Sequence, residues 1–367
     1  MRRFGCTLMC FVAALTVGLA QDTANGGGPY RVLRRANVGG EGGWDYIYAD
    51  AVARRLYIPR GATQQGASAR LTIFNLDTLA AAGEIDGAGG HGVAVDPKSD
   101  RGFVSGKPVS MFDTKTMKTI KTIDPGAASP DGILFDAYDE RVYVFSHPTK
   151  DATVIDAKDG TIVGTIDLGG TPEEGIADGR GKVYVVMQDM PGSVTVVDAK
   201  AMKATAHYSL GDIGRCNGLA LDARNGVLFA ACAASGTPPA QPAQAKMVVL
   251  SAADGKILTT FDMPGGSDGA VFNPTTGEAF ATLGNGKLFV VKETSPTTFE
   301  IEQVLDTMSG ARTITLDSKT GRIFTMADQR EPAPATPPPA AGEQGRGRGR
   351  GFRPAVPGSF TILEIGK

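Results

Sequence analysis

One short phrase recurs seven times along this chain of 367 residues. It begins with a polar residue, usually followed by Gly, continues through apolar-leaning positions and closes with Asp or Asn. Its copies occupy residues 45–50, 91–96, 131–136, 174–178, 217–222, 268–273 and 312–317. The closing residues are 46, 40, 42, 44, 51 and 44 positions apart, which is the length of one four-stranded propeller blade. The repeat predicts an all-β protein, a seven-bladed β-propeller.

The residues after each copy support four strands in each blade. A turn and then a β-branched and aromatic segment follow, as at 141–144 and 182–185, which suits a half-buried pleated surface. A third strand comes next, as at 194–198, and then a more polar one, as at 119–123. Polar residues suit the outer strand because it is the edge of its sheet.

The two ends of the repeat region predict how the ring closes. The last blade reaches its third strand at residues 359–363, close to the end of the sequence. Residues 30–34 have an outer-strand pattern and precede the first copy. We therefore expect this N-terminal strand to complete the last blade, which removes a free sheet edge.

The N-terminal residues predict the compartment. Arg2 and Arg3 precede an apolar stretch, residues 4–20, that ends in Gly18-Leu19-Ala20, the pattern of a cleaved signal peptide rather than a membrane span. We expect residues 1–20 to be a signal peptide, 21–29 a flexible N-terminus, and 30–367 a single propeller domain. The mature protein would be periplasmic or secreted, with no membrane span.

Two segments interrupt the repeat. Residues 233–245 carry three prolines and are expected to form a flap, and residues 330–357 are Pro-, Gly- and Arg-rich and are expected to be disordered. The formal net charge of −2 becomes −4 once Arg2 and Arg3 are removed. This near-balance of charge does not show the excess of basic residues that nucleic-acid binding needs. We expect a monomer.

The repeat units resemble those of the YVTN family of YncE-like bacterial propellers. The phrases that carry the resemblance include 111–116 and 196–199, and it extends over residues 30–366 apart from the two insertions. The chain departs from the family pattern where Asn should close the Tyr-Val phrase, since Ser146 and Arg60 stand there. The resemblance implies the propeller fold and says little about function, because propellers host unrelated activities.

The start of each copy predicts a site. The first strand of a propeller blade lines the central channel, so the polar residue that opens each copy lies at one mouth of that channel. Asp45 and Arg312 lack the following Gly and are placed by their distance to the closing Asp. The seven residues at this position are Asp45, His91, Asp131, Glu174, Asn217, Asp268 and Arg312. Polar residues before Gly are also ordinary turn residues, so a purely structural role remains open for each. His147 lies in the loop from Ser146 to Ala152, within reach of the mouth, and we favour its interpretation as a solvent-exposed loop histidine over a role at the mouth.

Three functions fit these residues. The first is a binding module that recognises a small molecule or a partner protein at the channel mouth. The second follows from a resemblance of Glu174, Asn217 and Asp268 to the metal ligands of gluconolactonase-type propellers, which implies a Ca²⁺- or Mg²⁺-dependent lactone hydrolase. The third, by analogy with similar propellers, is a partner of a quinone-dependent dehydrogenase. Whether the protein is an enzyme stays open, and no cofactor is certain.

Two cysteines remain outside the signal segment. Cys216 precedes the inner strand of the fifth blade, and Cys232 ends the strand beside it. The two should lie nearly opposite each other. Either a disulfide or a pair of buried thiols fits this placement.

Overall fold

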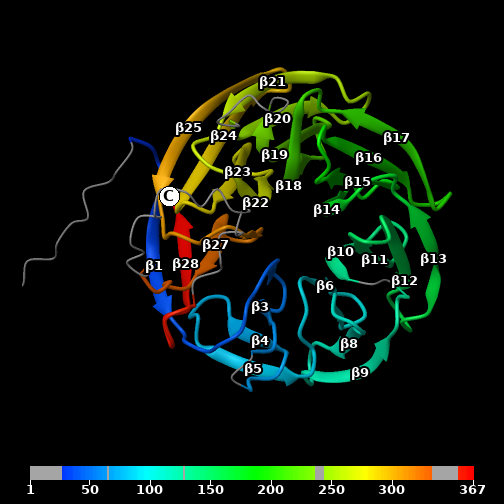
Figure 1. Ribbon diagram of the computed structural model, residues 1–367, viewed down its shortest axis with the longest axis vertical. Helices are drawn as coiled ribbons and strands as arrows, with labels where there is room; N and C mark the ends of the chain where they lie inside the picture. Colours follow the sequence, from blue (N-terminus) through cyan, green and yellow to red (C-terminus); the bar gives the residue numbers. More distant parts are fainter. Residues whose placement is uncertain (1–26, 64–65, 127–128, 236–243, 333–353) are drawn as a thin grey trace, which may run out of the picture.

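The computed structural model describes residues 27–63, 66–126, 129–235, 244–332 and 354–367. Over these residues the chain forms seven antiparallel sheets of four strands each, arranged as blades around the centre of a ring (Figure 1). The predicted fold class, a seven-bladed β-propeller, is confirmed. None of the described residues forms a helix able to cross a lipid bilayer.

Blades one to three contain twelve strands, which run outward from the channel in chain order. Blade one contains β2 (Tyr48–Asp50), β3 (Arg55–Arg60), β4 (Arg70–Asn75) and β5 (Ala81–Asp86). Blade two contains β6 (Val93–Asp96), β7 (Arg101–Val104), β8 (Val109–Asp113) and β9 (Lys118–Ile123). Blade three contains β10 (Pro130–Asp136), β11 (Arg141–Ser146), β12 (Asp151–Asp156) and β13 (Ile162–Asp167).

Blades four to six repeat this order, and blade seven joins both ends of the chain. Blade four contains β14 (Pro172–Ala177), β15 (Lys182–Met187), β16 (Ser193–Asp198) and β17 (Lys203–Ser209). Blade five contains β18 (Ile213–Asp222), β19 (Val227–Ser235), β20 (Lys246–Ser251) and β21 (Ile257–Asp262). Blade six contains β22 (Ser267–Asn273), β23 (Glu278–Leu283), β24 (Lys287–Ser295) and β25 (Thr298–Asp306). Blade seven contains β26 (Ile314–Asp317), β27 (Arg322–Ala327), β28 (Thr361–Gly366) and β1 (Arg31–Asn37).

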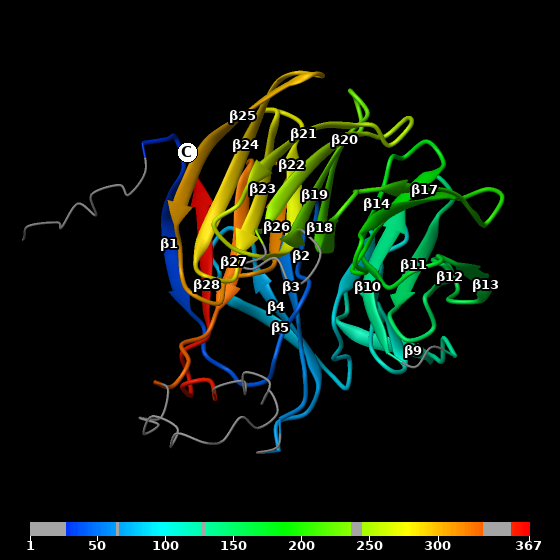
Figure 2. The ribbon, with the colours of Figure 1, turned by 45° about the horizontal axis from the view of Figure 1, so that its top comes forward.

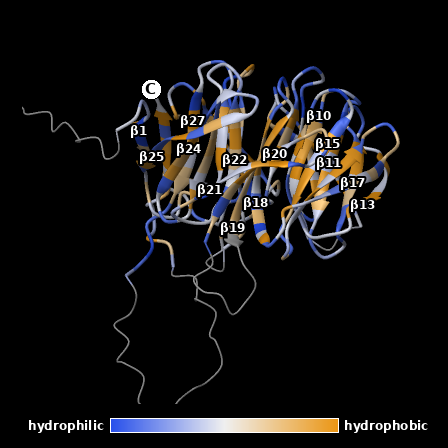
Figure 3. Cartoon of the chain, turned by 90° about the horizontal axis from the view of Figure 1, so that it is seen from above, coloured by the Kyte–Doolittle hydropathy of each residue, from blue (hydrophilic) through white to orange (hydrophobic). Residues whose placement is uncertain are grey.

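The hydrophobic core lies between the blades. The described residues form seven buried apolar clusters, and each cluster combines side chains from two neighbouring blades. Figure 3 shows the apolar residues within the sheets and the polar residues concentrated in the loops. Because each blade packs on both neighbours, the ring buries its full apolar area only when all the blades are in place.

The closing Asp or Asn of each repeat forms the turn into the second strand. Asp50 Oδ1 accepts hydrogen bonds from the backbone amides of Val52 and Ala53. Asp96, Asp136, Asp178, Asp222, Asn273 and Asp317 make the same kind of bond to the amide two residues ahead. A short carboxylate or amide side chain is suited to this turn, which explains why this position of the repeat varies so little.

The ring closes through β1, as predicted. The strand pairs antiparallel with β28, from Arg31 opposite Gly366 to Asn37 opposite Thr361, and the two lie side by side in Figure 2. The buried Glu364 of β28 forms an ion pair with Arg34 of β1, with 2.5 Å between Oε2 and Nη2. The predicted strand, residues 30–34, is shorter than the one observed, which continues to Asn37.

The two predicted insertions fall mostly outside the described residues. Residues 233–235, the start of the predicted flap, belong to β19, and residues 236–243 are not described. Of the second insertion, 330–357, the structure describes both ends, where Arg330 forms an isolated bridge with Ala355. The predicted disorder of this segment concerns residues outside the described part.

Candidate functional site

Local irregularities of the innermost strands place the polar residues at the channel mouth. In β10, β14, β18 and β22 the pairing with the next strand shifts register at the polar-Gly pair. In blades one, two and seven the innermost strand begins only after the corresponding two residues of the repeat. A β-bulge releases a residue from the ladder and redirects its side chain. The repeat thus leaves one polar side chain per blade free of regular pairing.

Four of these side chains, Asn217, Asp268, Arg312 and Asp45, form one half of a polar network. Asn217 Nδ2 donates to Asp268 Oδ1 at 2.7 Å, and Asp268 Oδ2 lies 3.1 Å from Arg312 Nε. Arg312 Nη2 lies 3.9 Å from Asp45 Oδ1 and donates to the carbonyl oxygen of Trp44. Arg312 therefore links blades six, seven and one across the mouth.

The other half is a cluster of two histidines and three carboxylates, which we call the histidine–carboxylate cluster: Asp45, His91, Asp131, His147 and Glu173. His91 Nδ1 lies 3.0 Å from Asp45 Oδ2 and 2.9 Å from Asp131 Oδ1. His147 Nε2 lies 2.7 Å from Asp131 Oδ2 and 3.4 Å from Glu173 Oε1. Asp131, whose side chain is 8% exposed, is shared by both histidines. Together the two halves connect side chains from all seven blades.

The carboxylates shift the pKa values of both histidines. Asp131 and Asp45 raise the pKa of His91 to about 10, and Asp131 and Glu173 raise the pKa of His147 to about 10. Burial would raise the pKa of Asp131, but the contacts with His147 and His91 outweigh it and keep that pKa below its ordinary value. Burial raises the pKa values of Asp45 and Glu173. With both histidines protonated, the positive groups Arg312, His91 and His147 alternate with carboxylates from Asp268 to Glu173.

Glu174 has a different environment from the other predicted mouth residues. Its Oε2 accepts hydrogen bonds from the backbone amides of Leu219 at 2.7 Å and Ala270 at 3.1 Å. These amides belong to β18 and β22, so the side chain ties blade four to blades five and six. Burial raises the pKa of Glu174 to about 8, although the two amides favour the anion. The carboxyl group of Glu174 therefore holds three blades together and does not take part in the polar network.

The contacts of Glu174 lead to a stability prediction. Glu174→Ala is expected to cost about 2–4 kcal/mol of unfolding free energy, because it leaves two inward-facing amides without an acceptor. Glu174→Gln keeps an acceptor oxygen and should cost less than about 1 kcal/mol. Denaturant unfolding of both variants measures the difference. Equal losses in the two variants would show that the acceptor is not what matters.

The structure brings six of the seven predicted mouth residues into one network, and Glu174 is the exception. Of the predicted metal ligands, Asn217 contacts Asp268, whereas Glu174 bonds to backbone amides. The assignment of these three to Ca²⁺ or Mg²⁺ stays a prediction. The interpretation of His147 as an exposed loop residue is wrong, since its side chain is 32% exposed and contacts two carboxylates.

Two further residues lie at the mouth that the repeat pattern does not single out. Glu173 precedes Glu174 in β14, and its Oε2 accepts a hydrogen bond from the Tyr46 hydroxyl at 2.7 Å. Gln188 Nε2 donates to Glu173 Oε1. The signal that could have found Glu173 is the bulge between Pro172 and Gly175, because two residues there compete for the place that one occupies in the other blades.

Inside the ring, beyond Tyr46, lies a mostly apolar cavity of about 470 Å³. Innermost-strand residues such as Val93, Ile133 and Ile314 line it, together with Tyr46 and Glu174. Pro97 and Ala137 also line it, and these residues follow the closing aspartates at the opposite end of the strands. The cavity therefore extends from the level of Tyr46 toward the face opposite the polar network.

Cys216 and Cys232 are joined by a disulfide. They are opposite each other in the pairing of β18 with β19, and both are fully buried. Cys216 immediately precedes Asn217, so the disulfide fixes the strand at the point where blade five contributes to the mouth.

Comparisons with known proteins agree on the architecture. No protein-family model matches the chain, and no curated protein matches it. Solved structures do. A chain of Kuenenia stuttgartiensis hydrazine synthase is 13% identical with a TM-score of 0.65, covering 79% of this chain and 94% of that one. The RRP9 WD40 repeats are 11% identical with a TM-score of 0.68, covering 93% and 100%.

A chain of the mitotic checkpoint complex is 12% identical with a TM-score of 0.65, covering 89% of this chain and 95% of that one. These identities are too low to carry a function across. The likeness identifies the chain as a seven-bladed β-propeller.

Proposed function

We propose that the protein is an exported binding module that takes a small polar ligand, or a polar segment of a partner protein, at its channel mouth. The observation that carries the proposal is the polar network to which all seven blades contribute a side chain. Its members remain partly accessible: the side chains of His91, Arg312 and Asp268 are 49%, 38% and 24% exposed. Convergent polar groups of this kind fix the orientation of a ligand and provide specificity.

The charges at the mouth favour a ligand with a positive or hydrogen-bond-donating group. Four carboxylates, Asp45, Asp131, Glu173 and Asp268, stand against Arg312 and the two histidines. Even with both imidazoles protonated, four negative and three positive charges leave a net charge of −1. With neutral imidazoles the net charge is −3, so a cationic ligand gains from either state.

Export and family membership are parts of the same proposal. The signal-peptide pattern of residues 1–20 supports export, and so does the Cys216–Cys232 disulfide, because disulfides persist in oxidising compartments. The repeat phrases support membership of the YVTN, YncE-like group of propellers. A fractionation experiment with the full chain would test export, since a cytoplasmic, uncleaved product contradicts it.

A thermal-shift experiment tests the binding proposal. The chain beginning at residue 27 is melted with a panel of small amines such as putrescine, and with succinate as the anionic counterpart. An amine that binds the folded state should raise the melting temperature with concentration, by an amount equivalent to about 2.7 kcal/mol at one hundred times its dissociation constant. Succinate should have no effect.

Matched variants locate the effect. Asp268→Asn should abolish the amine shift, because Asp268 bridges Asn217 and Arg312 at the mouth. Asp262→Asn, on the outer strand of blade five, should leave it intact, because the carboxylate of Asp262 pairs with Lys246, away from the mouth. An equal shift in Asp268→Asn, or no shift with any amine, contradicts a cation-binding mouth.

A further inference from the structure

The two histidines of the histidine–carboxylate cluster each present one nitrogen to two carboxylate oxygens. His91 Nδ1 faces Asp45 Oδ2 and Asp131 Oδ1, and His147 Nε2 faces Asp131 Oδ2 and Glu173 Oε1. A ring N–H points in one direction in the plane of the imidazole, so it cannot be well aligned with two oxygens at once. A cation placed between one such nitrogen and its two carboxylate oxygens can interact with all three atoms.

The geometry of His147 supports this reading independently. Its Nε2 is buried and has no hydrogen bond of acceptable geometry among the described residues, although Asp131 Oδ2 is only 2.7 Å away. The nitrogen and the oxygen are thus close neighbours that are not directed at each other. Such an arrangement is expected of a nitrogen and an oxygen that bind the same metal ion.

The spacing of the ligand atoms fits metal coordination. The nitrogen–oxygen distances of 2.7 to 3.4 Å bracket the separation of about 3.3 Å expected between ligands of a tetrahedral ion with bonds of about 2 Å. Asp45, His91 and Asp131 form one group of potential ligands, and Asp131, His147 and Glu173 form a second. Each group supplies one nitrogen and two oxygens.

We propose that the channel mouth binds two divalent first-row transition-metal ions, bridged by the carboxylate of Asp131. One ion is held by Asp45, His91 and Asp131 Oδ1, and the other by His147, Glu173 and Asp131 Oδ2. Imidazole nitrogen combined with carboxylate oxygen suits Zn²⁺ and its neighbours, whereas Ca²⁺ and Mg²⁺ prefer oxygen ligands alone. Three protein ligands per ion leave coordination positions for water or for a bound molecule.

Residues around the cluster hold the ligands in place. Glu173 Oε2 accepts a hydrogen bond from the Tyr46 hydroxyl at 2.7 Å, and Oε1, which faces His147, accepts one from Gln188 Nε2. Such outer contacts orient metal-binding carboxylates. Three carboxylates offset three of the four positive charges that two divalent ions carry.

This inference rests on the proposed function, because it names ions as part of what the mouth binds, but the two can fail separately. Metal content is measured without an organic ligand. Metal binding without any amine-induced rise in melting temperature would support the metal sites and contradict the amine ligand. An amine shift without metal binding would do the reverse.

The experiment is a titration of the EDTA-treated and dialysed protein, beginning at residue 27, with Zn²⁺, followed by calorimetry and metal analysis after gel filtration. Two ions per chain are expected. Co²⁺ should give visible absorption bands typical of nitrogen and oxygen ligands. His147→Gln and His91→Gln should each retain one ion, and Asp131→Asn should weaken both sites at least about tenfold, as expected for loss of a ligand.

The chain contains three histidines, and the third supplies the matched control. His207 lies in β17 and its Nδ1 contacts Thr195 Oγ1 at 2.9 Å, so His207→Gln should bind two ions. Melting curves in EDTA confirm that each variant is folded. Fewer than two ions in the folded wild-type protein, or an equal loss in His207→Gln, overturns the proposal.

Discussion

A chain that begins at Gly39 and therefore lacks β1 should not fold into a stable ring. The deletion removes the strand that pairs with β28 from Gly366 to Thr361. It also removes Tyr30, which packs edge-on against Phe280 and donates to the buried Glu278. We expect a loss of at least about 5 kcal/mol of unfolding free energy, which is comparable with the whole stability of many domains.

The exposed edge explains the expected behaviour of the deleted protein. All six residues of β28 are buried in the intact protein, and without β1 they would present unpaired backbone groups and apolar side chains, a template for aggregation. Gel filtration and thermal unfolding measure this. The reference is the chain beginning at Gly27, and a synthetic peptide of residues 27–38 should restore monomeric, cooperatively unfolding protein. An unchanged unfolding temperature in the deleted chain would contradict the role of β1.

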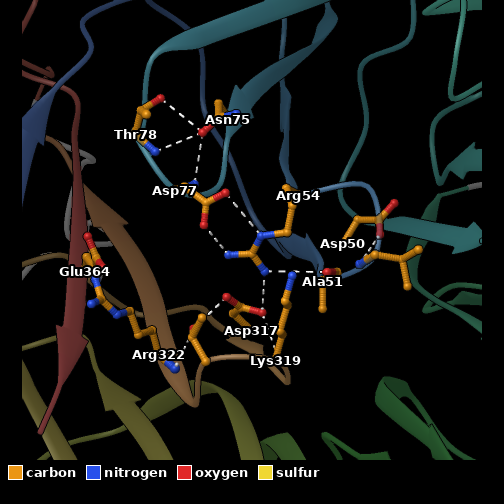
Figure 4. Close-up of polar contacts among 12 residues, drawn as sticks. Asp50, Ala51, Arg54, Asn75, Asp77, Thr78, Asp317, Lys319, Arg322 and Glu364 are labelled. Carbon is orange, nitrogen blue, oxygen red and sulfur yellow. Dashed lines mark hydrogen bonds and ion pairs between the residues drawn. The ribbon is translucent and has the colours of Figure 1, made fainter.

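The second large effect is expected at Arg54, on the face opposite the mouth. Its guanidinium lies between Asp77 and Asp317, as Figure 4 shows, with 2.5 Å from Nη2 to Asp77 Oδ1 and 2.8 Å from Nη1 to Asp317 Oδ1. The side chain of Asp317 is 1% exposed. Arg54→Met should cost about 2–4 kcal/mol, because it leaves a buried carboxylate without its cation.

Two further variants isolate the cause of this loss, measured by denaturant unfolding. Asp77 is 56% exposed, so Asp77→Asn should cost less than about 1 kcal/mol. Asp317→Asn in the Arg54→Met background should recover part of the stability, because the uncompensated charge is gone. Methionine keeps the positive φ of 56° at position 54 as unfavourable as arginine does, so backbone strain does not enter the comparison. No recovery would mean that lost packing dominates.

The fold was predictable because the repeat carries its own turn chemistry. Each closing Asp or Asn caps the turn between the first two strands, as Asp50 does with Val52 and Ala53, and that requirement fixes the spacing. The closure through residues 30–34 followed from a last blade that was one strand short. The end of β1 at Asn37 was not predictable, since residues 35–37 are held by their pairing with β28 rather than by their own pattern.

The mouth was predictable only in part. Position in the repeat identified Asp45, His91, Asp131 and the others, because channel-lining residues recur once per blade. It could not identify His147, because this residue lies in the β11–β12 connection, outside the repeated phrase, and contacts Asp131 only in the folded structure. Nor could it separate Glu173 from Glu174, because which of two adjacent carboxylates faces the mouth depends on how the bulge before Gly175 is resolved.

The bulges also bear on how such a protein can change. A residue released from the ladder contributes little to pairing, and the seven apolar clusters between the blades do not include it. Natural variation can therefore alter one mouth residue at a time while the scaffold stays intact. A combinatorial library restricted to the seven predicted mouth positions would sample many chemistries on one backbone, and the position of Glu174 would resist exchange because its carboxylate bonds to two backbone amides.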